Sequence, residues 1–144
     1  MGGTGGGCVP DGGLSAGPYA MDFEHWPLVV VRVVGRVSDD QHRSFIAQLD
    51  ARVRQAREPY AMIMDLRGSG GITPVQRRRQ AERVERLRDE GLPCAGVGLV
   101  LDSPLLRGML TAVMWLARPA HEVRVFQQVS DARIWGETLL GQAA

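Results

Sequence analysis

Residues 60 to 76 bring an acidic group, hydroxyl groups and several glycines together at the spacing of a strand, a loop and a helix. An apolar run ends in Asp65, a glycine-rich segment follows, and Thr73 then stands three residues before Gln76. A hydroxyl residue three positions ahead of Gln is typical of a helix amino terminus, where free backbone N–H groups and the helix dipole attract negative charge. We expect this corner to hold a phosphate, a phosphorylated side chain or a partner's carboxylate.

Five residues of this corner are candidates for regulation or partner binding: Asp65, Ser69, Gly70, Gly71 and Thr73. Asp65 should accept hydrogen bonds from loop N–H groups beside Arg67 and so hold the corner in shape. A catalytic acid would need a carboxylate or histidine nearby, and the local sequence has none. The glycines allow positive φ angles and leave room for a partner. Thr73 is either a helix cap, worth about 1 kcal/mol, or a site of phosphorylation, with Ser69 as a second hydroxyl in the loop.

The other reactive side chains form no recognisable catalytic or metal-binding set. The three histidines, at positions 25, 42 and 121, lack the spacing of metal ligands. Cys94 begins an apolar strand, where a thiol is expected to be a small core residue. The corner glycines match a dinucleotide-binding pattern only in part, because Thr73 stands where a third glycine would open the helix. We therefore predict no catalytic residue, no metal and no cofactor, and a protein that is not an enzyme.

The composition favours one globular domain that binds neither nucleic acid nor a membrane interior. The 144 residues carry a formal net charge of +1 and are 44% hydrophobic, which suits a single core and gives no strong field toward a polyanion. The arginines between positions 77 and 88 alternate with acidic residues and lack aromatic neighbours, as in a solvated or protein-contact face. No apolar run reaches the ~20 residues that span a bilayer, and no secretory signal is evident. We expect a cytoplasmic protein.

Strands and helices alternate along the chain on either side of the corner. Apolar periodicity predicts strands at 21–26, 28–34, 60–65, 95–101 and 122–126, and capping patterns predict helices that open at Ser38, Thr73, Ser103 and Ser130. The first two strands should pair antiparallel across the turn at Trp26-Pro27, and each later strand is reached through a helix, which favours parallel neighbours. The prediction is a single-domain α/β fold of order β-β-α-β-α-β-α-β-α, with a mixed four- to five-stranded sheet and four helices.

The domain is expected to cover residues 20–142. Residues 1–19 are rich in glycine and have almost nothing to bury, so we expect them to form a disordered tail. The predicted domain can begin at Met21, which is therefore an alternative start of the chain.

Two of the predicted helices differ in their expected packing. The helix that Thr73 opens should pack on the sheet through a narrow apolar face made of Ala81, Val84 and Leu87, with Arg77 and Gln80 near its upper edge. The helix expected from Pro104 to Ala117 carries one charge and is apolar all round, so it should be covered on more than one side. One of its faces has Leu105, Leu106 and Met109, and the other has the interface candidates Arg107, Thr111, Met114 and Trp115. Met114 and Trp115 would reach a dimer partner, a binding protein or a lipid-like ligand, unless the final helix or a loop covers them.

Three stretches carry a family resemblance. The first is the opening strand region Trp26–Gly35, the second is the acidic strand end at Asp65, and the third is Val125–Trp135, where Phe ends a strand and Ala-x-x-Trp follows in a helix. In these stretches and in its element order the chain resembles a STAS domain, and more closely the SpoIIAA-like (STAS/SEC14-type) group, over residues 21 to 140.

This resemblance implies a protein-interaction or ligand-sensing module rather than an enzyme. STAS anti-sigma-factor antagonists are switched by phosphorylation of a Ser or Thr at the loop–helix corner after the third strand, and Thr73 is similar in position. The Asp-Ser-x-Gly pattern of those antagonists is absent here, because Ile72 precedes Thr73 and Pro74 follows it.

Two functions follow as hypotheses. The leading one is a signalling or regulatory module that contacts a protein partner, such as a kinase-like or sigma-related regulator, through the corner of residues 65–76. The alternative is a carrier or sensor of a small apolar, lipid-like ligand, held between the helix of residues 104–117 and the sheet beneath it. A homodimer through that helix is a further arrangement.

Overall fold

Six strands form one mixed sheet and lie side by side in chain order. The computed structural model describes residues 13–117 and 121–143. The strands are β1 (Gly13–Ala16), β2 (Tyr19–Asp22), β3 (Leu28–Gly35), β4 (Tyr60–Ser69), β5 (Cys94–Val100) and β6 (Glu122–Phe126). β1, β2 and β3 pair antiparallel, whereas β3 to β6 are all parallel.

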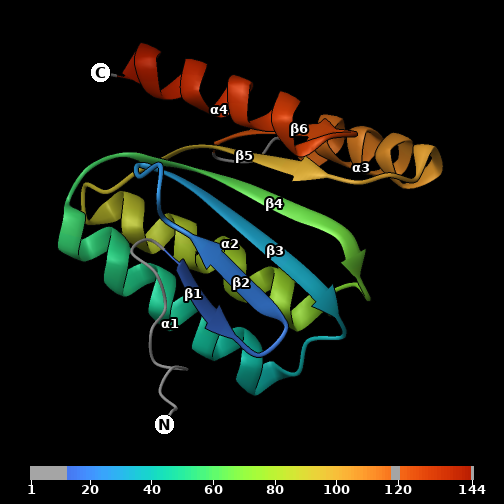
Figure 1. The fold of residues 1–144 in the computed structure, drawn as a ribbon, viewed down its shortest axis with the longest axis horizontal. Helices are drawn as coiled ribbons and strands as arrows, with labels where there is room; N and C mark the ends of the chain where they lie inside the picture. Colours follow the sequence, from blue (N-terminus) through green and yellow to red (C-terminus); the bar gives the residue numbers. More distant parts are fainter. Residues whose placement is uncertain (1–12, 118–120, 144) are drawn as a thin grey trace, which may run out of the picture.

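Helices connect the parallel strands and cover both faces of the sheet. They are α1 (Asp39–Ala56), α2 (Pro74–Asp89), α3 (Pro104–Ala117) and α4 (Val129–Ala143). Figure 1 shows α1 and α2 on one face of the sheet, α4 on the other face, and α3 beside β6. Because β3 to β6 run in the same direction, their carboxyl ends and the starts of the helices that follow them meet at one edge.

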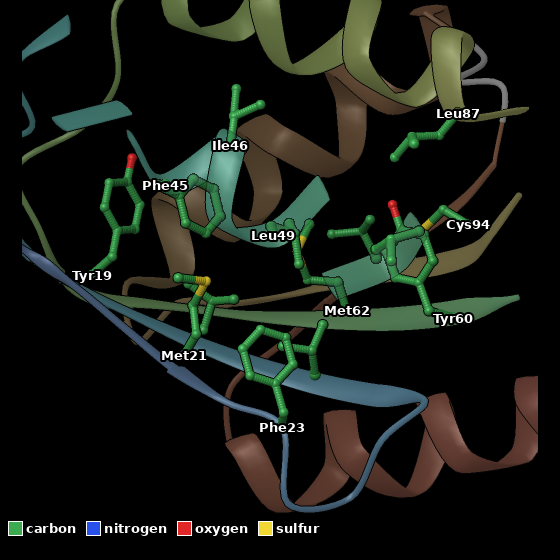
Figure 2. Close-up of a cluster of buried hydrophobic side chains, with 14 of the residues drawn as sticks. Tyr19, Met21, Phe23, Phe45, Ile46, Leu49, Tyr60, Met62, Leu87 and Cys94 are labelled. Atoms are coloured by element: carbon green, nitrogen blue, oxygen red, sulfur yellow. The ribbon is translucent and has the colours of Figure 1, made fainter. Parts of the chain in front are cut away.

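The larger part of the core lies between the sheet and the helices α1 and α2. Figure 2 shows it built from side chains of the β2 region, α1, β4 and α2, among them Met21, Phe45, Leu49, Met62 and Leu87. Each such fully buried apolar side chain stabilises the fold by about 1.5–3 kcal/mol relative to exposure. This packing holds α1 and α2 against one face of the sheet.

A second, smaller core lies under α4. It contains Leu28, Ile63 and Ala132, with Trp135 packed against it. A Cβ atom at Gly96 would lie 2.6 Å from Leu139 Cδ1 and 2.9 Å from the Trp135 ring. β5 therefore carries glycine where α4 approaches its backbone most closely.

The predicted element order and the mixed α/β sheet are confirmed, but the extent of the tail was wrong. Residues 13–16 form β1 and pair with β2, and Gly17 turns the chain with a φ of 59°. Tyr19, placed in the tail by its neighbours' composition, is buried, and its ring stacks on Phe45 at 4.1 Å. The sheet therefore has six strands rather than four to five. Residues 1–12 lie outside the described part of the chain.

Two element boundaries also differ from the prediction. The first predicted strand, at 21–26, is β2 at Tyr19–Asp22, because Tyr19 and Met21 supply its inward side chains. The last helix begins at Val129 rather than after a cap at Ser130, and Ala132 N donates to Gln128 O at 3.3 Å.

A chain that begins at Met21 should be less stable than the full chain, because it lacks β1, half of β2 and the Tyr19–Phe45 stack. We expect its free energy of unfolding to fall by about 3 kcal/mol or more, as for loss of a buried aromatic residue. Urea unfolding followed by circular dichroism measures the change. A chain lacking only residues 2–12 is the matched control, and equal stability of the two truncated chains would show that the hairpin adds nothing.

Candidate functional site

The loop of the candidate corner is shorter than the sequence indicates. β4 does not end at Asp65 but continues to Ser69, where Gly68 pairs with Val34 and Ser69 with Gly35 after a register shift. The strand prediction was wrong here because pairing with a distant strand, invisible in local sequence, outweighs the poor strand propensity of glycine. Ser69 therefore ends a strand rather than lying within the loop.

Residues 70–73 are the loop proper, and hydrogen bonds shape its start. Gly70 N donates to Gly35 O at 2.8 Å, and Gly71 N donates to Ser69 Oγ at 3.0 Å. A Cβ atom at Gly70 would lie 2.9 Å from Arg36 Cγ and 3.2 Å from Arg36 N. Gly71 has a φ of 97°, a conformation that favours glycine. Both glycines are thus needed for the turn itself, whatever binds there.

The first turn of α2 is anchored on its inner side and exposed to solvent on its outer side. Thr73 Oγ1 accepts a hydrogen bond from Gln76 N at 3.1 Å, and Gln76 Oε1 accepts one from Thr73 N at 3.3 Å, so the capping box is complete. Gln76 is buried and also donates through Nε2 to Val37 O and to Asp39 Oδ1 at the start of α1. Thr73 itself is exposed, and so are its apolar neighbours Ile72 and Val75 at 44% and 52%.

Asp65 is a structural acid that holds an arginine. Arg67 donates through Nε and Nη2 to the two carboxylate oxygens, each at 2.8 Å, and through its backbone N at 3.2 Å. These hydrogen bonds lower the pKa of Asp65, and the nearby Arg32 acts in the same direction. The carboxylate is ionised, buried and fully engaged. It therefore presents Arg67, which is exposed, rather than itself to an incoming molecule.

The exposed surface around the corner is basic. Arg36 follows β3, Arg67 lies on β4, and Arg77 and Arg78 lie in the first turns of α2, all of them exposed. The first turn of α2 has no acidic residue. Within the described residues, Arg36, Arg77 and Arg78 form no ion pair. Together with the positive end of the α2 dipole, these groups favour an acidic ligand surface.

Beneath α2 lies a buried charged network that sequence reasoning missed. Arg83 is 0% exposed; its Nε donates to the buried Asp50 of α1, and its Nη2 donates to Tyr60 Oη of β4 at 2.9 Å. Burial raises the pKa of Tyr60, so the phenol stays neutral, and its ring lies 5.7 Å from the guanidinium carbon. Arg86 approaches the second Asp50 oxygen at 3.8 Å. One buried arginine thus ties α1, α2 and β4 together.

Parallel polar links run along the whole α1–α2 contact. Near the helix starts, Gln76 bonds Asp39. One turn on, Arg79 Nη1 lies 3.1 Å from His42 Nδ1. Beyond the Arg83–Asp50 pair, Arg54 bonds both oxygens of Glu90 at 2.9 Å. The inner face of α2 is therefore largely polar, and it consists of Gln76, Arg83, Val84 and Leu87 rather than the predicted Ala81, Val84 and Leu87, since Ala81 is exposed.

The structure describes two of the four interface candidates on α3, Arg107 and Thr111, and of these Thr111 is exposed. Arg107 is half-buried and donates to Leu101 O at 2.8 Å, and Thr111 Oγ1 donates to Arg107 O. The leucine face is also open, with Leu105 73% exposed and both Leu106 and Met109 exposed. α3 lies at the β6 edge of the sheet (Figure 1). The side chains of Met114 and Trp115 lie outside the described residues.

No further reactive group or metal site is evident among the described residues. Burial raises the pKa of Cys94 to about 11, so its thiol is neutral, and it donates to Gly96 O at 3.4 Å. Among residues 13–117 and 121–143, no group of three or more His, Cys, Asp or Glu could hold a metal ion. No helix within those ranges is long and apolar enough to cross a bilayer.

Comparison with known proteins agrees with this architecture. A family model described as SpoIIAA-like matches residues 28–136. A protein of the DUF3478 family with a SpoIIAA-like fold, from Shewanella loihica PV-4, has a TM-score of 0.61 at 12% identity, over 82% of this chain and 91% of that one. The anti-sigma factor antagonist SpoIIAA in its unphosphorylated form has a TM-score of 0.56 at 12% identity, over 81% of this chain and 94% of that one. At such identities the likeness concerns the fold alone. No curated protein sequence matches the chain.

Replacing Arg83 should destabilise the protein strongly, because it leaves Asp50 charged and buried without its partner. For Arg83→Met we expect a loss of about 3–5 kcal/mol in the free energy of unfolding, and for the double variant Asp50→Leu/Arg83→Met a much smaller loss. Urea denaturation measures both.

Arg54→Met is the matched control, since the Arg54–Glu90 pair links the same two helices from the solvent side and should matter little. If Arg83→Met were no more harmful than Arg54→Met, the buried network would not be what holds α2.

Proposed function

The chain belongs to the SpoIIAA-like family, and we propose that it is a non-catalytic signalling or regulatory module that binds a protein partner through its β4–α2 corner. We define this corner as Arg67, residues 70–78 and Arg36. The observation that carries the proposal is the pair of exposed apolar side chains, Ile72 and Val75, on either side of a helix start that is rigidly anchored from below.

The chemistry of the corner indicates the kind of partner. Apolar groups at the centre with arginines at the rim match the usual anatomy of a protein interface. The arginines and the α2 amino terminus favour acidic residues on the partner's rim. SpoIIAA, which has a similar fold, is an anti-sigma factor antagonist, and this supports a kinase-like or sigma-related regulator as the partner. Preorganisation also helps, because an anchored loop loses little entropy on binding.

Thr73 and Ser69 are the candidates for switching the corner. The Thr73 hydroxyl is on an exposed residue and serves α2 only as an acceptor, so a phosphate would lie at the positive end of the helix. Phosphorylation adds about −1.5 to −2 charge. That charge would neutralise the surrounding arginines and repel an acidic partner, and so would lower its affinity.

Phosphoproteomic mass spectrometry of the native host tests this switch. We expect a phosphate on Thr73, or on Ser69, in at least one growth condition, because both hydroxyl groups lie at the basic corner. Absence of phosphate from both residues in every condition would remove the switch while leaving the binding surface to be tested separately.

The α3 face supports a second candidate, a carrier or sensor of a small apolar ligand. Leu105, Leu106 and Met109 form an exposed apolar face that water solvates poorly. One hollow of about 410 Å³ among the described residues lies elsewhere, on β2 and β3 near Arg32 and Val34. Native mass spectrometry separates the candidates, since a stoichiometric bound lipid would favour the carrier.

A carboxylate introduced at the centre of the corner should strongly reduce partner capture without changing the fold. We expect Ile72→Asp and Val75→Asp each to lower the capture of a specific host protein by about tenfold or more, because each places a carboxylate in an apolar contact. Pull-down with the tagged full chain and quantitative mass spectrometry measures the capture.

Ile134→Asp is the matched control, because Ile134 is also an exposed apolar residue but lies on α4, across the sheet. Loss of capture in the Ile134 variant alone would move the binding surface to α4. Capture unchanged in both corner variants would contradict the proposal.

A further inference from the structure

We propose that His42 is an acid-sensitive latch, which together with Gln76 holds the first two turns of α2 against α1 and loosens them when the imidazole takes up a proton. The inference concerns regulation of the corner and rests on the proposed function for its biological meaning. The predicted opening of α2 in acid can be tested without any partner.

The latch is the hydrogen bond between His42 of α1 and Arg79 of α2. His42 lies on α1 and is 2% exposed, and its Nδ1 is 3.1 Å from Arg79 Nη1 of α2. A guanidinium can only donate hydrogen bonds, so Nδ1 must be the acceptor and the ring proton must be on Nε2. The neutral imidazole is therefore the form that fits this contact.

The groups that face His42 disfavour its charged form. Burial lowers the pKa of His42 most, and the positive charge of Arg79 lowers it further, whereas Gln80 of α2 and Asp39 of α1 act in the opposite direction. On the sheet side the ring adjoins Phe45, which stacks on Tyr19 of β2 and brings no charge. A second proton would place an N–H on Nδ1 directly against the N–H of Arg79. The contact would then change from attraction to repulsion.

The sign of the pH effect follows from this lowered pKa. An unfolded or locally opened chain binds a proton near a pKa of about 6.5, before the folded chain does. The open form therefore gains protons first, and the closed form loses stability as the pH falls through that value toward the lower pKa of the folded state. Above that pH range the hydrogen bond between His42 and Arg79 contributes its full stabilisation to the closed form.

The rest of α2 is held by contacts of a different kind. Arg83 and Arg54 pair with carboxylates, and the hydrogen bond from Arg54 lowers the pKa of Glu90, which keeps that carboxylate charged in mild acid. Opening should therefore be confined to residues 74–81, which without the His42 contact keep the Gln76 hydrogen bonds to Val37 and Asp39. These include Val75 and Gln76, so mild acid would loosen the corner and weaken partner binding.

Hydrogen–deuterium exchange of the full chain, corrected for intrinsic rates, tests the latch. Between pH values of about 7.5 and 5.5 we expect protection of residues 74–81 to fall about threefold or more, while residues 84–89 change little. His42→Gln, whose amide oxygen still accepts from Arg79, should show no such fall. His25→Gln, at an exposed loop position, should behave as the wild type.

Two outcomes would overturn the latch. One is a wild type whose protection of residues 74–81 does not depend on pH, and the other is a His42→Gln variant that loses protection as the wild type does. Should His42→Gln fold poorly, an NMR titration of the wild type decides instead. The amide signals of residues 74–81 must then move with the His42 imidazole signal, and an independent titration of the two would contradict the latch. A chain that captures no protein at any pH but shows the expected exchange would count against the proposed function and support the latch.

Discussion

The buried pair of Arg83 and Asp50 is the constraint on which the arrangement of the site depends. Moving two charges out of water costs several kcal/mol each, and the cost is offset only where the geometry satisfies them. Asp50 and Tyr60 accept hydrogen bonds from Nε and Nη2 of Arg83 at one alignment of α1, α2 and β4, while the buried Nη1 has no hydrogen-bond partner among the described residues. A shift of α2 along its axis would preserve many apolar contacts but would separate Arg83 from Asp50 and Tyr60. We interpret it as the feature that fixes where α2 begins.

From that fixed helix the properties of the corner follow. The inner side of the first turn is occupied by Gln76, which bonds the start of α1. The outer side is left to exposed apolar groups and arginines, of which Arg36, Arg77 and Arg78 form no ion pair within the described residues. This fixed base and its open, basic and partly apolar surface are the features on which the proposed partner binding rests. Within the described residues, moreover, the acid of the corner, Asp65, is engaged with Arg67 and is not free to transfer protons.

Local patterns in the sequence predicted whatever depends on local chemistry. The capping boxes at Ser38 and Thr73 and the periodicity of the later strands gave the correct order of elements from β2 onward. The larger errors involve partners that are distant in the sequence. β1 is a glycine-containing strand stabilised by pairing, and the end of β4 is held by β3. Arg83 was assigned to solvent because charge is normally exposed, although Asp50, within the apolar stripe of α1, was a signal of a buried counter-charge.

The most direct test of the central claim is a hydrogen-exchange footprint of the captured partner on the full chain. The account predicts that binding adds protection at residues 70–78 and leaves the outer face of α4 unchanged. A footprint on α4, with residues 70–78 exchanging as in the free protein, would contradict it.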